Sequence, residues 1–187
     1  MNFRVSRTIP NCSDCIIGNI LNKEINSVYN TLIVSPPGLG KTTLLKDITK
    51  RISNGMEDFK GITVSVIDER GEIGASYKGV VQNDLGIRTD LIDNIPKAIG
   101  IKMVVRSMSP KVVIADEIGT KEDGDAIRYL VRCGVKGIFT AHAYDILDLK
   151  CNPILRELIN ENIFEKIILI KSRKKSNIEK EVYSFEK

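Results

Sequence analysis

Residues 35–43 read SPPGLGKTT, and they follow a short apolar run at residues 29–34. Apolar residues then recur at helical spacing over residues 41–52, before Asn54-Gly55 ends the pattern. A glycine-rich turn between a strand and a helix points several backbone N–H groups and the positive helix end at one place, where a phosphate can bind. The stretch therefore predicts a phosphate-binding loop within an α/β fold.

Each residue type in this loop suits a triphosphate ligand. Lys41 supplies a point charge for the β and γ phosphates, and the Thr42 hydroxyl is a ligand for Mg²⁺. Gly38 and Gly40 let the backbone approach the phosphates closely. We assign nucleotide binding to the whole loop, which is Ser35, Pro36, Pro37, Gly38, Leu39, Gly40, Lys41, Thr42 and Thr43.

The first position of the loop departs from the usual G-x-x-x-x-G-K-[ST] pattern, because Ser35 stands where that pattern has glycine. If the position requires a positive φ, a residue other than glycine costs roughly 1–2 kcal/mol there. We therefore expect binding that is weakened and not abolished.

A second apolar run, residues 112–115, ends in Asp116-Glu117. After a phosphate-binding loop, a carboxylate at such a strand end holds the metal shell, and we assign Mg²⁺ to Thr42 and Asp116. The adjacent Glu117 is placed to polarise the attacking water as general base. The pair predicts an ATPase with ATP and Mg²⁺ as its ligands.

The remaining pattern predicts a P-loop NTPase fold with a RecA-like or AAA+ core, in which helices flank a mainly parallel sheet. We expect a lead-in segment over residues 1–27 and one ATPase domain over residues 28–187, with a C-terminal hairpin at 164–186. The basic run KSRKK at residues 171–175 is expected as a solvated hairpin tip. Further expected strands are 62–67, 137–140 and 167–170, and further expected helices are 96–108 and 122–133, with a long polar loop from 72 to about 93.

Composition sets the broad class. The 187 residues are 42% hydrophobic and 28% charged, with a formal net charge of +4, as in an ordinary globular domain. No apolar stretch approaches the roughly 18–20 residues of a membrane span, and the start lacks the apolar core of a signal peptide, so we expect a cytoplasmic protein. Cys12 and Cys15 have no second pair to complete a zinc site and are interpreted as ordinary thiols.

Other polar side chains follow predicted strands. Asp68-Glu69 follows residues 62–67, and either joins the metal and water network or caps the next loop. His142, the only histidine, follows the strand at 137–140 and is either a phosphate sensor or a structural residue. The residues alone leave both alternatives open.

Several short blocks of sequence are specific enough to indicate a family: VIDERGEIG, GIRTD, RSMSP, ADEIG and TAHA. Over about residues 3–170 the chain resembles the stage III sporulation protein AA family, which is similar to the ATPases of type II and type IV secretion and pilus assembly. The resemblance implies a RecA-like ATPase that acts as a homo-oligomeric ring, suspected to be a hexamer. It also implies docking on a membrane protein of a sporulation channel complex, and thus a peripheral position at the membrane.

Site residues carry over from the family only where the motifs match. Lys41 and Thr42 match the Walker A residues, Asp116 and Glu117 the Walker B acids, Asp68 and Glu69 an acidic box, and Thr140 and His142 a histidine box. Arg88 and Arg106 match basic residues that could stabilise transition-state charge from the same or a neighbouring subunit. The catalytic residues assigned in this way are Glu117, Glu69, His142, Arg106 and Arg88.

Two further departures from the family accompany Ser35. Thr120 stands where the family usually has arginine, and the family's N-terminal domain does not precede the core, which predicts a truncated or minimal form. The charge of +4 and the basic run at 171–175 keep open a nucleic-acid-dependent ATPase, although nucleic acid is not the expected partner. Ser35 and Thr120 keep open a nucleotide-binding assembly subunit with little turnover.

Overall fold

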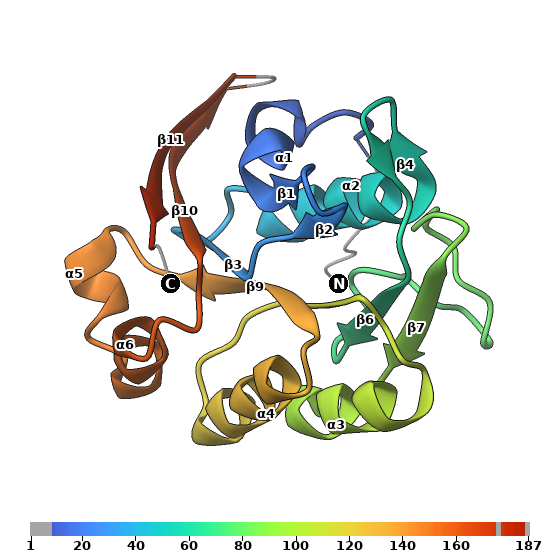
Figure 1. Cartoon of the computed structure of the whole chain (residues 1–187). Helices are drawn as coiled ribbons and strands as arrows, with labels where there is room; N and C mark the ends of the chain where they lie inside the picture. Colours follow the sequence, from blue (N-terminus) through green and yellow to red (C-terminus); the bar gives the residue numbers. More distant parts are fainter. Residues whose placement is uncertain (1–8, 175–176, 186–187) are drawn as a thin grey trace, which may run out of the picture.

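The chain folds around one twisted sheet with helices on both faces (Figure 1). The computed structural model describes residues 9–174 and 177–185. Seven strands run in the order β11-β10-β3-β9-β8-β6-β7, and every neighbouring pair is parallel except β10 and β11. These strands are β3 (Thr31–Ser35), β6 (Val64–Asp68), β7 (Thr89–Asp93), β8 (Val112–Ala115), β9 (Lys136–His142), β10 (Lys166–Lys174) and β11 (Asn177–Ser184). The predicted class, a mainly parallel α/β sheet, is confirmed.

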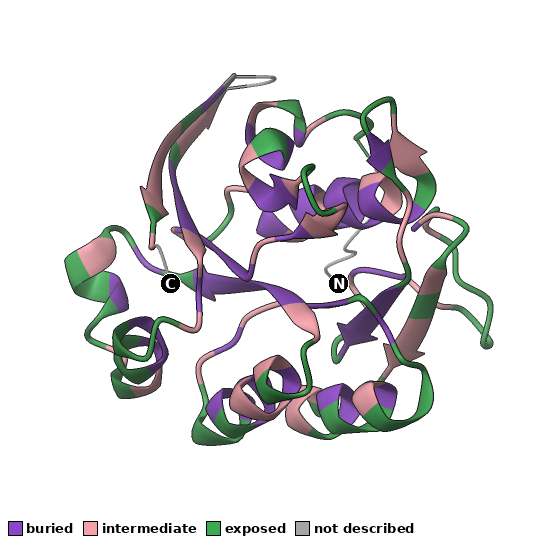
Figure 2. Ribbon diagram, in the orientation of Figure 1, coloured by how far each residue is buried: buried purple, intermediate pink, exposed green. Residues whose placement is uncertain are grey.

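The two faces of the sheet are covered by different helices. Alternate residues of one strand point to opposite faces, so Ile33 packs with α1 and α2 whereas Leu32 and Val34 pack with α3, α4 and α6. Both packed layers are buried in Figure 2, with exposed residues on the outer helix faces. The helices are α1 (Asp14–Ile20), α2 (Lys41–Asn54), α3 (Lys97–Ser107), α4 (Lys121–Arg132), α5 (Ile146–Leu149) and α6 (Pro153–Asn160).

Parallel pairing brings the carboxyl ends of the central strands to one edge. β3 lies between β10 and β9, with Ser35 opposite His142. β8 follows on the far side of β9, and Ala115 at its end lies opposite Ile67 of β6. Because ligands of open α/β sheets gather at this edge, the loops after β3, β6, β8 and β9 define the place to look for a site.

The N-terminal segment, expected only as a lead-in, packs on α2. Its described part holds α1 and a small pair of strands, β1 (Leu21–Asn22) and β2 (Ser27–Val28), and Ile16 and Ile20 are fully buried. The buried carboxylate of Asp47 on α2 accepts hydrogen bonds from the backbone N–H of Asn11 at 3.0 Å and of Ser13 at 2.9 Å. The segment is thus tied to the helix that begins at the glycine loop, while the division of the chain at residue 27 stays a prediction.

Two regions differ from the expected element pattern. The polar stretch ends in a strand, because β7 pairs in parallel with β6 as the edge of the sheet. A further antiparallel pair, β4 (Gly55–Met56) and β5 (Phe59–Lys60), follows α2, and neither this pair nor the helices α5 and α6 were predicted.

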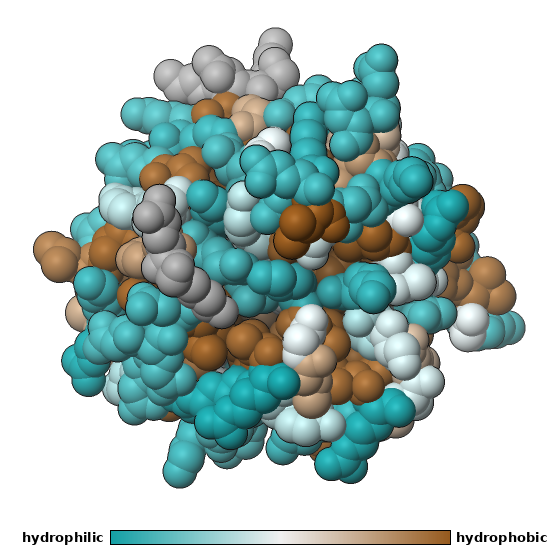
Figure 3. Space-filling view, viewed as in Figure 1, coloured by the Kyte–Doolittle hydropathy of each residue, from teal (hydrophilic) through white to brown (hydrophobic). Residues whose placement is uncertain are grey.

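The C-terminal strands β10 and β11 pair antiparallel, in the arrangement of the predicted hairpin. The basic run is not simply its tip, since residues 171–174 belong to β10 and residue 175 lies outside the described residues. On the side shown in Figure 3 the surface is mainly hydrophilic, with separate apolar areas. In the described part of the chain, no helix is both long and apolar enough to cross a membrane.

Candidate active site

The glycine loop joins the end of β3 to the start of α2. Gly38 and Gly40 adopt left-handed conformations with φ of 82° and 80°, which glycine reaches without the strain that a side chain would bring. A Cβ on Gly40 would also lie 2.6 Å from Nη1 of Arg173, a residue of β10. The turn needs glycine at this position for its backbone angle, and a side chain there would also displace the Arg173 guanidinium.

Ser35 does not carry the strain that its position in the motif suggested. It is the last residue of β3, paired with His142 in extended conformation, and is not among the residues with positive φ. Its buried hydroxyl donates to the carbonyl of Pro36 at 2.9 Å and accepts from Lys41 Nζ at 3.0 Å. The expected penalty of a non-glycine residue therefore does not arise here, and the serine adds a partner for the loop lysine.

Lys41 is buried, and four acceptor atoms lie within hydrogen-bond distance of its ammonium group. Besides Ser35 Oγ, Nζ donates to the carbonyls of Ser35 at 2.9 Å and Pro36 at 3.2 Å, and to His142 Nδ1 at 2.8 Å. Burial lowers the pKa of Lys41, while the charges of Asp116 and Glu117 act in the opposite direction. The amino group is thus held at the sheet edge, facing the acids that follow β8.

Asp116 binds hydroxyls from two neighbouring elements. Thr42 Oγ1 donates to Asp116 Oδ2 at 2.6 Å, and Thr140 of β9 donates to Asp116 Oδ1. The Thr140 hydroxyl also accepts the backbone N–H of Glu117 at 2.8 Å, which fixes the turn after β8. A hydroxyl next to a carboxylate offers the hard oxygen ligands that Mg²⁺ prefers, so these residues fit the metal predicted for them.

Glu117 is held through both its backbone and its carboxylate. Its backbone has φ of 53°, an uncommon conformation for a residue other than glycine and one that clusters at functional sites. Oε1 contacts His142 Nε2 at 3.0 Å, and Oε2 pairs with Arg70 Nη1 at 2.5 Å. Burial raises the pKa of Glu117, but the His142 hydrogen bond and the Arg70 charge outweigh it, so the net pKa is lowered and the group is ionised at neutral pH.

His142 joins the lysine to the glutamate. Since the ammonium of Lys41 can only donate, Nδ1 of His142 is the acceptor, and Nε2 carries the proton that is donated to Glu117. One neutral tautomer satisfies both contacts. The predicted residues Lys41, Thr42, Asp116, Glu117, Thr140 and His142 thus form one connected cluster.

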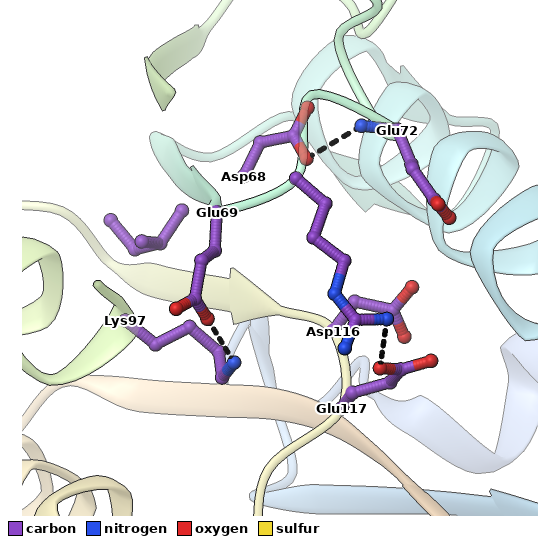
Figure 4. A pocket seen from close by; sticks show the side chains of 8 residues that line it. Asp68, Glu69, Glu72, Lys97, Asp116 and Glu117 are labelled. Atoms are coloured by element: carbon purple, nitrogen blue, oxygen red, sulfur yellow. Dashed lines mark hydrogen bonds and ion pairs between the residues drawn. The ribbon is translucent and has the colours of Figure 1, made fainter. Parts of the chain in front are cut away.

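Asp68 caps a loop. Its buried carboxylate accepts the backbone N–H groups of Glu72 at 2.9 Å, Ile73 at 2.9 Å and Gly74 at 2.7 Å. Of the two alternatives for the acids at the end of β6, these contacts show the loop cap for Asp68. The neighbouring Glu69 pairs with Lys97 and lines a pocket at the sheet edge (Figure 4). The pocket is formed by Ile67, Asp68, Glu69, Arg70, Glu72, Lys97, Asp116 and Glu117.

The two arginines assigned to transition-state charge lie elsewhere on the chain. Arg88 donates to the carbonyl of Ser53 at 3.0 Å, and the Arg106 guanidinium lies 5.8 Å from the Tyr129 ring centre. Within one chain, neither makes a described contact with the cluster around Glu117, so the geometry does not support a contribution from the same subunit. A contribution across a subunit boundary stays a prediction.

Three cations near the site had no assigned role. Arg70 pairs with Glu117, Arg173 reaches the glycine loop, and Lys46 is a buried residue of α2. Burial lowers the pKa of Lys46, against the charges of Asp68, Glu72 and Asp116. The block VIDERGEIG placed Arg70 next to the acids, and the helical spacing placed Lys46 on α2, but the approach of Arg173 depends on tertiary structure alone.

Thr120, the other departure from the family, has a local structural role. Its side chain accepts the backbone N–H of Asp123 at 3.2 Å, while the Asp123 carboxylate accepts the backbone N–H of Thr120 at 3.0 Å. This reciprocal capping box begins α4. The residue therefore starts a helix beyond the acids, and no described contact joins it to the cluster.

The comparisons agree with the motifs. The family model described as Sporulation stage III, protein AA matches residues 1–186. The chain is 40% identical over 158 residues to the stage III sporulation protein AA of Bacillus subtilis (strain 168), covering 84% of this chain and 52% of that protein. The chain thus spans about half the length of that relative.

Solved structures share the fold. The ATPase DotB of Legionella pneumophila has a TM-score of 0.63 at 16% identity, covering 94% of this chain and 50% of that one. The pilus retraction motor PilT, solved with bound ADP, has a TM-score of 0.62 at 15% identity, covering 98% of this chain and 55% of that one. At such identities the likeness establishes the P-loop ATPase fold alone. By its sequence, the chain belongs to the Sporulation stage III, protein AA family.

Proposed function

We propose that the chain binds ATP with Mg²⁺ and hydrolyses it to ADP and phosphate. The observation that carries this proposal is the convergence of Lys41 and Thr42, which begin α2, with Asp116 and Glu117, which follow β8, at one edge of the sheet. A strand, a glycine loop and a helix start supply the phosphate cradle. Asp116 and Glu117 supply the other part of the site that hydrolysis requires, a ligand for the metal and a base for the water.

The side chains divide the chemistry among them. Lys41 exchanges the carbonyls of Ser35 and Pro36 for phosphate oxygens, which are stronger partners for an ammonium group. Glu117, ionised and partly exposed beyond the end of β8, accepts the proton of the water whose oxygen bonds to the γ-phosphorus as the bond to ADP breaks. Thr42 and Asp116 would hold Mg²⁺, which supplies positive charge for the phosphate oxygens when bound.

We propose further that this ATPase drives a secretion-like channel of sporulation as a homo-oligomeric ring docked on a membrane protein. The family membership and the fold shared with DotB and PilT support this role. In a ring, Arg88 and Arg106 on the surface of one subunit could approach the site of the next. A hexamer is the stoichiometry proposed.

Two variants and a control test the ATPase proposal. Lys41→Ala should lose nucleotide binding in a calorimetric titration with ATP and Mg²⁺, because the ammonium at the loop is removed. Glu117→Gln should keep binding and lose hydrolysis, because the amide cannot accept the proton. Lys102→Ala, an exposed lysine of α3, should leave both properties unchanged.

Unchanged ATP affinity in Lys41→Ala would overturn the loop assignment, and full turnover in Glu117→Gln would overturn the general base. The ring is tested separately by the specific activity over a series of protein concentrations, together with sedimentation. Turnover per chain that rises as the oligomer forms supports shared sites, whereas constant turnover by a monomer contradicts them. Hydrolysis stimulated by added DNA or RNA, with steep salt dependence, would replace the channel role with a nucleic-acid-dependent one.

A further inference from the structure

Arg173 connects the C-terminal hairpin to the glycine loop. It lies in β10, the neighbour of β3, far along the chain from the loop itself. Its Nη1 approaches the carbonyl of Gly40 at 3.3 Å and that of Leu39 at 3.5 Å. The guanidinium therefore lies in contact with the turn, so close that a Cβ on Gly40 would collide with it.

The charge of Arg173 is not neutralised by an acid in the part of the chain that the structure describes. No ion pair of Arg173 with a described carboxylate occurs, whereas Lys171, two residues earlier, pairs with Glu181. Neutral carbonyls and the thiol of Cys12 are its described neighbours. A half-buried guanidinium with neutral partners keeps its capacity for an anion.

The position of Arg173 along the loop indicates which part of a nucleotide it meets. The ammonium of Lys41 lies with Ser35, Pro36 and His142, and this lysine serves the β and γ phosphates. Arg173 instead contacts Gly40. A Cβ built on Gly40 would lie close to the Arg173 guanidinium and 3.9 Å from Cβ of Thr43, in the first turn of α2. The backbone N–H groups of such a loop cradle the α and β phosphates, so the α-phosphate is the one that Lys41 does not serve.

We propose that Arg173 is a further nucleotide-binding residue, which donates to the α-phosphate from the C-terminal hairpin. This proposal rests on the proposed ATP site and names one of its contacts. On binding, the guanidinium exchanges the carbonyls of Leu39 and Gly40 for phosphate oxygens, with which it forms shorter and stronger hydrogen bonds. The basic run at 171–175, first interpreted as solvated surface, then contributes one residue to the site.

The test compares ADP with ADPαS, in which sulfur replaces one non-bridging α-phosphate oxygen. Calorimetric titrations with ADP and each ADPαS diastereomer use the wild-type chain, Arg173→Ala, Arg173→Lys and the control Lys171→Ala. Loss of one charged hydrogen-bond donor should weaken ADP binding by about tenfold in Arg173→Ala. The control keeps wild-type affinity because Lys171 pairs with Glu181 outside the loop.

The thio effect separates contact from mere support of the loop. In the wild-type chain one ADPαS diastereomer should bind more weakly than ADP, and Arg173→Ala should lose that difference, while Arg173→Lys recovers part of the ADP affinity through its charge. If Arg173→Ala weakens ADP and both diastereomers by the same factor, Arg173 only supports the turn and the proposal is wrong. Wild-type affinity in Arg173→Ala also overturns it, whereas failure of the wild-type chain to bind ADP overturns the ATP site as well.

Discussion

Replacing Asp68 by alanine tests whether this acid anchors a loop or takes part in the reaction. Asp68 is 3% exposed, and its carboxylate accepts three consecutive backbone N–H groups, from Glu72 to Gly74. These bonds fix the turn that carries Glu69 and Arg70 into the pocket of Figure 4. Asp68→Ala removes both acceptor oxygens, and with them all three hydrogen bonds, and adds no new group.

The expected loss of stability follows from the backbone N–H groups that remain without an acceptor. The N–H groups of Ile73 and Gly74 are buried in these bonds, and that of Glu72 is partly so. A buried donor without a partner costs about 1–3 kcal/mol, so two of them lower the free energy of unfolding by roughly 2–6 kcal/mol. For a domain of this size, that corresponds to a fall in Tm of about 4–24 °C.

Thermal unfolding followed by circular dichroism measures this loss, and Asp90→Ala is the matched control. Asp90 is an exposed acid of β7, the strand that pairs with β6, and its removal should leave Tm within about 1–2 °C of the wild type. An unchanged Tm in Asp68→Ala, combined with a large fall in ATP turnover, would refute the loop-anchor assignment and place Asp68 in the reaction instead.

Two smaller changes test other parts of the chain. Thr120→Ala removes one half of the capping box with Asp123, and should lower the free energy of unfolding by about 1 kcal/mol without loss of ATP binding; an unchanged Tm would contradict the cap. Arg70→Gln removes the ion pair that lowers the pKa of Glu117, so that pKa should rise. The acid limb of the ATPase pH profile should then move to higher pH. The stability that ionised Glu117 provides should likewise be lost at a higher pH when the solution is acidified. An acid limb that stays in place would exclude this role of Arg70.

The features that sequence predicted well are those encoded by neighbouring residues. The strand, glycine loop and helix around residues 35–43 are contiguous, so their residue types directly report the geometry. The same holds for β8 and the two acids after it, where a short apolar run meets polar residues. Each of these signals is local. The parallel sheet then follows from the alternation of strands and helices along the chain.

The features that were missed depend on tertiary contacts or on weak local signals. β7 is an edge strand that reads TDLID, and its charged residues hide the apolar pattern of a strand. α1 has only seven residues, too few to show a clear helical period before its packing on α2 is known. The contacts of Arg173 with the glycine loop join β10 to a turn more than a hundred residues away in sequence, and no spacing rule reports them.

Ser35 shows that the effect of a departure from a motif depends on the contacts that the residue makes in the folded chain. As a pattern, serine at a glycine position predicts strain, but at this position the backbone is extended and the hydroxyl is a partner of Lys41. His142 contacts the same ammonium and, through its other nitrogen, Glu117. A ligand that takes Lys41 from these partners also removes the donor at His142 Nδ1, and so changes the group that holds the Glu117 carboxylate. The residue that departs from the motif therefore belongs to the network that connects Lys41 to Glu117, the proposed general base.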